Sequence, residues 1–142
     1  MPPGINPFTG LDINVPTEWH ERLFEKYCQG RANSNIENRP FPRMIDLWFF
    51  SICIAVRNNK TPAEMGSSTT KFQDGGILGG DPGRVQALML IAAESAGDLD
   101  ITINPNEMMR IVSGLAVAGF PLVEEMLQGG GDKPLFSLSH AV

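Results

Sequence analysis

Side chains able to carry out chemistry are scattered along this chain and do not gather in a known motif. The segment 58–83 holds the most reactive set, which is Lys60, Lys71, Asp74 and Asp81. A loop longer than about 12–15 residues without regular structure is usually functional or disordered. One hypothesis is therefore an enzyme with its site in the 58–83 loop. Because no nucleophile, base and carboxylate stand in a recognisable arrangement, we instead predict a protein without catalytic residues.

The glycine-rich stretch 75–83, GGILGGDPG, invites comparison with a phosphate-binding loop. It lacks the Gly-Lys-Ser/Thr ending of a nucleotide P-loop, so a loop leading into a capped helix is the better interpretation. His20 and Cys28 could share one face of a helix, but two ligands do not make a zinc site. The acidic pair Glu124 and Glu125 is typical of a solvated surface. We expect no cofactor and no metal.

The formal net charge of −5 disfavours non-specific binding to nucleic acid, because phosphate contacts need clustered cations. The segment 22–60 is nevertheless locally basic, with seven Lys and Arg against three Asp and Glu. An alternative hypothesis is thus a small nucleic-acid-binding module. Its candidate residues are Arg31, Arg39, Arg43, Arg57 and Lys60. A solvated rim around an apolar helix explains the same residues more simply.

The composition favours a cytoplasmic protein. The chain has 2 cysteines and no Cys-x-x-Cys motif, which indicates a reducing compartment. The start MPPGINPFTG has neither the basic residues nor the apolar stretch of a signal peptide. The apolar run 44–56 contains only Asp46 and Ser51 as polar residues, but it is shorter than the roughly 20 residues that a membrane span needs. We expect no membrane contact.

Apolar periodicity and capping residues predict a mainly α protein, with one compact domain of about four helices and two or three short marginal strands. The helices are expected over 18–29, 44–57, 82–96 and 105–128. Strands are expected over 11–15 and near 71–73 or 77–78, and 99–103 should form a short strand or an extended connector. The 44–57 helix is apolar on nearly every side and should form the centre of the core. Pro121 should kink or break the last helix, and Gly114 and Gly119 should admit another element closely.

Both ends of the chain are expected to be extended. The predicted divisions are an N-terminal arm over 1–16, a helical domain over 17–131 with a long glycine-rich loop at 58–80, and a tail over 132–142. Apolar residues in the ends either fold back over the core or dock on a partner. These candidate partner-binding residues are Ile5, Phe8, Leu11, Leu135, Phe136 and Leu138. If they dock, removal of 1–14 or 132–142 should leave the domain folded.

One pattern resembles a known family. It runs Arg39-Pro40-x-x-x-Met44-x-x-Leu47-x-Phe49 and continues to Ala55-Val56-Arg57-Asn58-Asn59-Lys60. It resembles a segment of small accessory proteins from bacterial DNA phosphorothioation (sulfur-modification) and related anti-phage defence loci, where such an entry leads into a buried helix and a basic turn. The later stretch 116–122, AVAGFPL, is similar to a small-residue helix of that family, although Pro121 departs from it.

The resemblance implies a role without catalysis. Over about residues 17–127 it points to an accessory or assembly subunit of a defence complex, which binds a larger nuclease or ATPase, or another copy of itself. Contact with nucleic acid would then be indirect. The family offers no catalytic residue that can be placed on this chain, so the resemblance implies a partner and no site chemistry.

Overall fold

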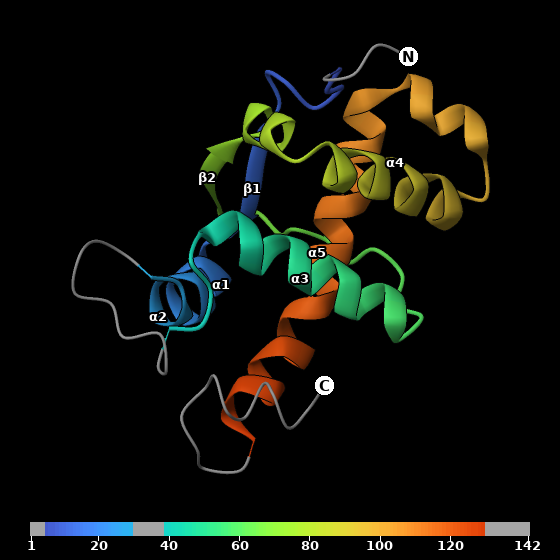
Figure 1. The fold of residues 1–142 in the computed structure, drawn as a ribbon. Coiled ribbons are helices and arrows are strands. Elements are labelled where there is room, and N and C mark those ends of the chain that lie inside the picture. Colours follow the sequence, from blue (N-terminus) through green and yellow to red (C-terminus); the bar gives the residue numbers. More distant parts are fainter. Residues whose placement is uncertain (1–4, 30–38, 130–142) are drawn as a thin grey trace.

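The computed structural model describes residues 5–29 and 39–129. Helices dominate them and one small sheet lies at their side (Figure 1). The predicted mainly α single domain is confirmed. In chain order the elements are β1 (Asp12–Pro16), α1 (Thr17–Trp19), the π-helical η1 (His20–Phe24), α2 (Glu25–Tyr27), α3 (Met44–Arg57), β2 (Thr69–Asp74), the 3-10 helix η2 (Gly75–Gly80), α4 (Pro82–Ala96), the 3-10 helix η3 (Leu99–Ile103) and α5 (Pro105–Gln128).

The helix boundaries follow from local capping chemistry. Asp81 caps α4 by accepting a hydrogen bond from the Arg84 backbone N–H at 3.3 Å, and Gly97 ends it with a φ of 68°. Asn104 caps α5 by accepting from the Glu107 N–H at 3.2 Å. The bounds predicted for α3, α4 and α5 are confirmed.

The first helical segment is built differently from the expected single helix over 18–29. It comprises α1, η1 and α2, it begins at Thr17, and no side chain caps it. It ends at Tyr27 because Cys28 adopts an extended conformation with φ −94° and ψ 141°. Cys28 then forms a parallel bridge with Phe41, and this backbone pairing stops the helix before the predicted end.

The sheet joins two segments far apart in the sequence. β1 pairs with β2 in antiparallel fashion, and the register shifts between Ile13 and Asn14. The strand predictions at 11–15 and near 71–73 are confirmed. The segment 77–78 belongs to η2, and the prediction of a short strand or an extended connector over 99–103 was wrong, since these residues form the 3-10 helix η3. A period of two in apolar residues cannot by itself exclude a short 3-10 turn.

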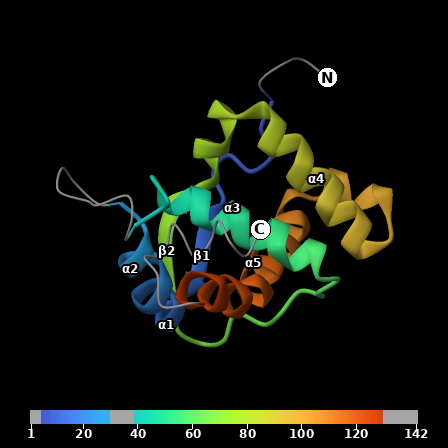
Figure 2. The same cartoon turned by 60° about the horizontal axis from the view of Figure 1, so that its bottom comes forward.

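The centre of the core is α5 and not the apolar α3. Fourteen residues of α5 are buried, against seven of α3, and α5 contacts α3, α4, η3 and β1. Both views show α3 lying across α5 (Figures 1 and 2). Within the apolar run 44–56 only Val56 is exposed, at 40 %, and the other residues are buried or half-buried, so the prediction of burial on nearly every side holds except at the C-terminal end of α3.

Two glycines allow the close approach that the sequence predicted. A Cβ on Gly119 would lie 2.0 Å from the Ser51 carbonyl oxygen on α3, and one on Gly114 would lie 2.7 Å from the Cβ of Pro62. The Gly114 carbonyl also accepts a hydrogen bond from the Ala63 N–H at 2.9 Å. Pro121 does not break α5, which continues to Gln128.

The N-terminal arm is part of the domain from residue 5 onward. Phe8 and Ile13 are fully buried, and Leu11 packs against the core. A free arm was therefore the wrong interpretation for Phe8, which no partner can reach in this structure. Deletion of 1–14 would remove core side chains, so the expectation that the domain survives it is corrected. Ile5 is exposed, and Leu135, Phe136 and Leu138 lie outside the described residues.

Helix α5 is long and apolar enough to cross a membrane by length and composition alone. The most apolar window of the helix has a mean hydropathy of 1.3 and is 56 % buried inside the domain. A core helix of a folded domain has the same composition, and the contacts of α5 with α3, α4 and β1 account for its apolar faces.

Candidate functional site

The described basic residues that were predicted for nucleic-acid binding differ in their surroundings. Arg39 donates hydrogen bonds to the backbone carbonyls of Glu25 and Cys28, at 2.7 and 2.9 Å. Arg43 is held by Asp46, with an N–O distance of 3.2 Å. Only Arg57 and Lys60 share one exposed turn, at the end of α3. Arg31 lies outside the described residues.

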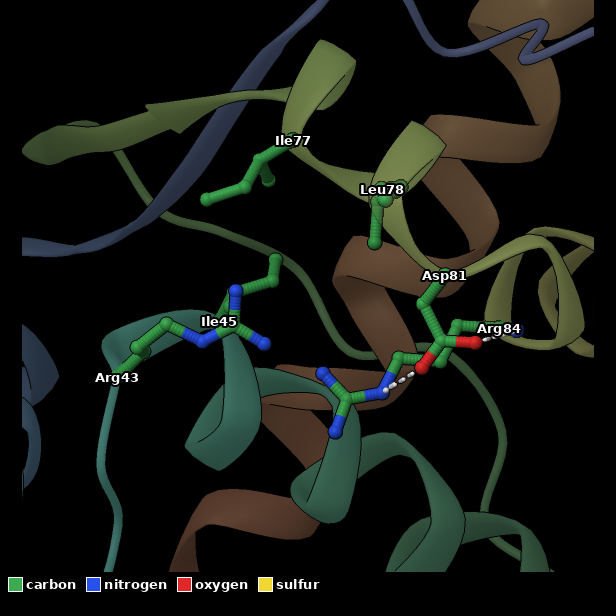
Figure 3. A pocket seen from close by; sticks show the side chains of 7 residues that line it. Arg43, Ile45, Ile77, Leu78, Asp81 and Arg84 are labelled. Carbon is green, nitrogen blue, oxygen red and sulfur yellow. Dashed lines mark hydrogen bonds and ion pairs between the residues drawn. The ribbon is translucent and has the colours of Figure 1, made fainter. Parts of the chain in front are cut away.

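A small pocket lies where the N-termini of α3 and α4 meet. Its volume is ≈ 150 Å³, and its lining includes Arg43, Arg84, Asp81 and the apolar Ile77 and Leu78. Figure 3 shows both guanidinium groups turned toward the space beside the two apolar side chains. This arrangement of two arginines and two helix N-termini favours a negatively charged group.

The protein itself supplies that negative group. Asp46 Oδ1 accepts from Arg84 at 2.8 Å and from Arg43 at 3.2 Å, while Oδ2 accepts from the Arg43 backbone N–H at 3.0 Å. Asp81 lies 3.4 Å from Arg84 Nε. Two carboxylates thus balance two guanidinium groups. The cluster fastens the start of α3 to the start of α4 and leaves no surplus charge for an anionic ligand.

The same contacts set the protonation of Asp46. Partial burial alone would raise the pKa of Asp46, but the hydrogen bonds and charges of Arg43 and Arg84 outweigh this effect. The pKa of Asp46 therefore lies below its ordinary value. A carboxylate held ionised by two partners is poorly suited to accept or donate protons near neutral pH.

The side chains of the 58–83 loop that could serve an enzyme have structural contacts. Lys71 pairs with Asp12 at 2.8 Å across the sheet. Asp74 accepts from the backbone N–H of Gly76 at 2.7 Å, which lowers the pKa of Asp74. Asp81 caps α4, as described above. Lys60 is exposed on the turn after α3, apart from the other three. These residues do not converge on a common site.

The cysteines and histidine are also placed in structural roles. Burial raises the pKa of the Cys28 thiol to about 12 and raises that of Cys53, so neither is a reactive thiolate at neutral pH. His20 lies 3.5 Å from Glu25 and stacks on Phe24. Across residues 5–29 and 39–129, no three His, Cys, Asp or Glu side chains gather closely enough to hold a metal.

The environment predicted for one acidic residue was wrong. Glu124 was expected on a solvated surface, yet it is buried. Both of its carboxylate oxygens accept from the Arg22 guanidinium, each at 2.6 Å, and the same guanidinium lies 4.7 Å from the Trp19 ring centroid. This bidentate pair fastens the N-terminal helical segment to the end of α5.

A groove opens between the C-terminal end of α3 and the C-terminal half of α4. Its volume is ≈ 560 Å³. Its apolar lining is Val56, Leu90, Ile91 and Leu115, and its polar rim includes Lys60 and Glu94. Val56 and Leu90 are 40 % and 66 % exposed, although both are apolar. This lining fits a protein segment better than a charged metabolite.

The most exposed large apolar side chains lie on η3. Leu99 is 71 % exposed and Ile103 is 85 % exposed. The sequence placed these residues on a marginal strand, and no partner-binding role was predicted for them. The available signal was the run Leu99-Asp-Ile-Thr-Ile103 itself, which has more apolar residues than a surface connection requires.

Comparisons with known proteins give no relative. A scan against protein-family models, a search of curated proteins and a search of solved structures each found no match.

Proposed function

We propose that this chain is a non-enzymatic accessory subunit that binds a larger protein through η3. The observation that carries the proposal is the exposure of Leu99 and Ile103, at 71 % and 85 %. Each side chain would gain about 1.5–3 kcal/mol on full removal from water. A partner that covers η3 would supply that burial.

The partner surface is defined by the chemistry around these two side chains. Asp98 and Asp100 flank Leu99, and Asp100 is exposed. The Asp98 side chain accepts from the Asp100 backbone N–H at 2.9 Å, which fixes the turn. A complementary surface would have an apolar recess for Ile103 and Leu99 and a cation facing Asp100.

The resemblance to accessory proteins of defence loci supports one class of partner protein. A larger nuclease or ATPase of a DNA-modification or anti-phage defence complex would fit an accessory subunit of this size. In such a complex the chain would contact nucleic acid only through its partner. Within the domain, Arg39 donates hydrogen bonds to backbone carbonyls and Arg43 pairs with Asp46, which is consistent with an indirect contact with nucleic acid.

A recovery experiment with point variants tests the proposal. Tagged full-length chain would be recovered from cells of its native host, as wild type, Ile103→Asp or Leu99→Asp. We expect a larger protein to accompany the wild type and to be lost from both variants, because each buries a charge at the interface. Ser67→Asp adds the same charge at another exposed position and should retain the partner. Equal recovery by all four proteins would contradict the proposal.

A further inference from the structure

The groove between α3 and α4 has a shape that accommodates one more helix. Both helices pack on α5, and the Asp46–Arg84 ion pair joins their N-terminal ends. The groove opens between the C-terminal end of α3 and the C-terminal half of α4, and Figure 2 shows both helices beside α5. Leu115 of α5, which is 1 % exposed, forms the floor. Two helical walls over an apolar floor are the geometry that accepts an amphipathic helix.

The chain itself presents a helix that fits this groove. Leu90 projects from α4 at the edge of the groove and is 66 % exposed. Glu94 follows one turn later on the same face of α4, because residues four apart are neighbours on a helix. The groove edge thus combines a projecting apolar side chain with an apolar recess formed by Val56 and Ile91.

The charged residues on the rim of the groove would be complementary between two identical copies of the chain. Lys60 stands on the α3 side and Glu94 on the α4 side, and both are exposed. Within the described part of the chain, neither forms an ion pair. In a two-fold arrangement each contact made by one copy is repeated by the other, so two Lys60–Glu94 pairs would form between the copies.

We infer that the α3–α4 groove is occupied by α4 of a second copy of this chain, in a two-fold symmetric dimer. Leu90 of each copy enters the recess of the other, and Glu94 of each copy faces Lys60 of the other. The inference uses a different surface from η3, so it does not depend on the partner proposed above. A dimer would offer two η3 surfaces and make the subunit bivalent.

Analytical ultracentrifugation of the full chain tests the dimer. Over about 1 µM to 1 mM, a range that covers weak interfaces, we expect the wild type to shift from monomer to dimer. Leu90→Asp should stay monomeric, because it would place a charge in the apolar recess. Ile103→Asp is the control, since its exposed apolar side chain does not line the groove, and it should dimerise normally. A monomeric wild type, or a dimer that survives Leu90→Asp, would overturn the inference.

A charge exchange tests the pairing itself and does not disturb the core. Lys60→Glu and Glu94→Lys alone should each weaken their own dimer roughly tenfold, because two attractive pairs become repulsive. An equimolar mixture should regain wild-type affinity, since every contact between positions 60 and 94 again joins opposite charges. A mixture that dimerises no better than its components contradicts this pairing. Circular dichroism of each variant verifies the fold.

The outcomes separate the dimer from the accessory role. Loss of dimerisation in Leu90→Asp with retention of the larger partner would support the groove as a self-association site and η3 as the partner site. A protein that never dimerises but loses its partner in Ile103→Asp would overturn the inference and leave the proposed function standing.

Discussion

Gly119 sits where the α5 backbone touches the Ser51 carbonyl of α3, and the absence of a side chain there sets how closely the two helices pack. We predict that Gly119→Ala destabilises the domain by about 3 kcal/mol, because the new methyl group would meet backbone that cannot move alone. The matched control is Gly83→Ala in α4, where the Cβ would lie 3.4 Å from the nearest atom. Urea unfolding should show no loss for the control, since alanine favours a helix.

Asp46 couples the stability of the domain to pH. Its folded pKa is lowered by Arg43 and Arg84, so its contribution is complete above the pKa of an unfolded aspartate, about 3.9. It is lost as the pH falls from there through the lowered folded value. We predict that Asp46→Asn is less stable than wild type at pH 7 and that the difference shrinks below about pH 4. A constant difference across thermal melts from pH 7 to pH 2.5, a range reaching below about 3.9, would contradict this assignment.

At the scale of single residues, interactions between residues close in the sequence were predictable, whereas interactions between distant segments were not. The caps Asp81 and Asn104 act on residues three positions away, so the sequence shows them directly. The Arg22–Glu124 pair joins residues 102 positions apart, and the Asp46–Arg84 pair joins residues 38 apart. Nothing local to Glu124 or Asp46 indicates those partners.

Helix α5 tolerates a proline in its interior. Pro121 has no N–H to donate to the carbonyl of Val117, four residues earlier, and it lies on an exposed face. We predict that Pro121→Ala raises the free energy of unfolding by about 1–2 kcal/mol, because it restores that hydrogen bond. Pro105→Ala is the control, since a proline at the first helical position breaks no bond. A less stable Pro121→Ala, measured by urea unfolding, would show that the packing needs a bend at this site.

At the scale of elements, the helices over 44–57, 82–96 and 105–128 were predicted to the residue, whereas the first helical segment and the segment 99–103 were not. The segment 99–103 alternates apolar and polar residues as a strand does, yet it pairs with no strand of the described residues and forms a 3-10 turn. Helix α3 has the most apolar sequence but crosses only one face of α5. Which element becomes central is decided by packing, and composition alone does not specify it.

At the scale of the whole molecule, Phe8 and Ile13 are buried near the sheet, whereas Ile5 on the N-terminal segment is exposed. Four further exposed large apolar side chains among the described residues, Val56, Leu90, Leu99 and Ile103, lie on α3, α4 and η3. These four residues are separate in sequence, and their exposure depends on the tertiary arrangement. The sequence predicted partner-binding residues in the terminal segments, and the burial of Phe8 contradicts that prediction for this one residue.

The measurement that tests the central claim most directly is the native mass of the complex recovered with the tagged chain. The account predicts one larger protein at a fixed ratio to this chain, present with wild type and with Ser67→Asp and absent with Ile103→Asp. Recovery of this chain with no other protein, or of the same complex with Ile103→Asp, would contradict an accessory subunit that binds through η3.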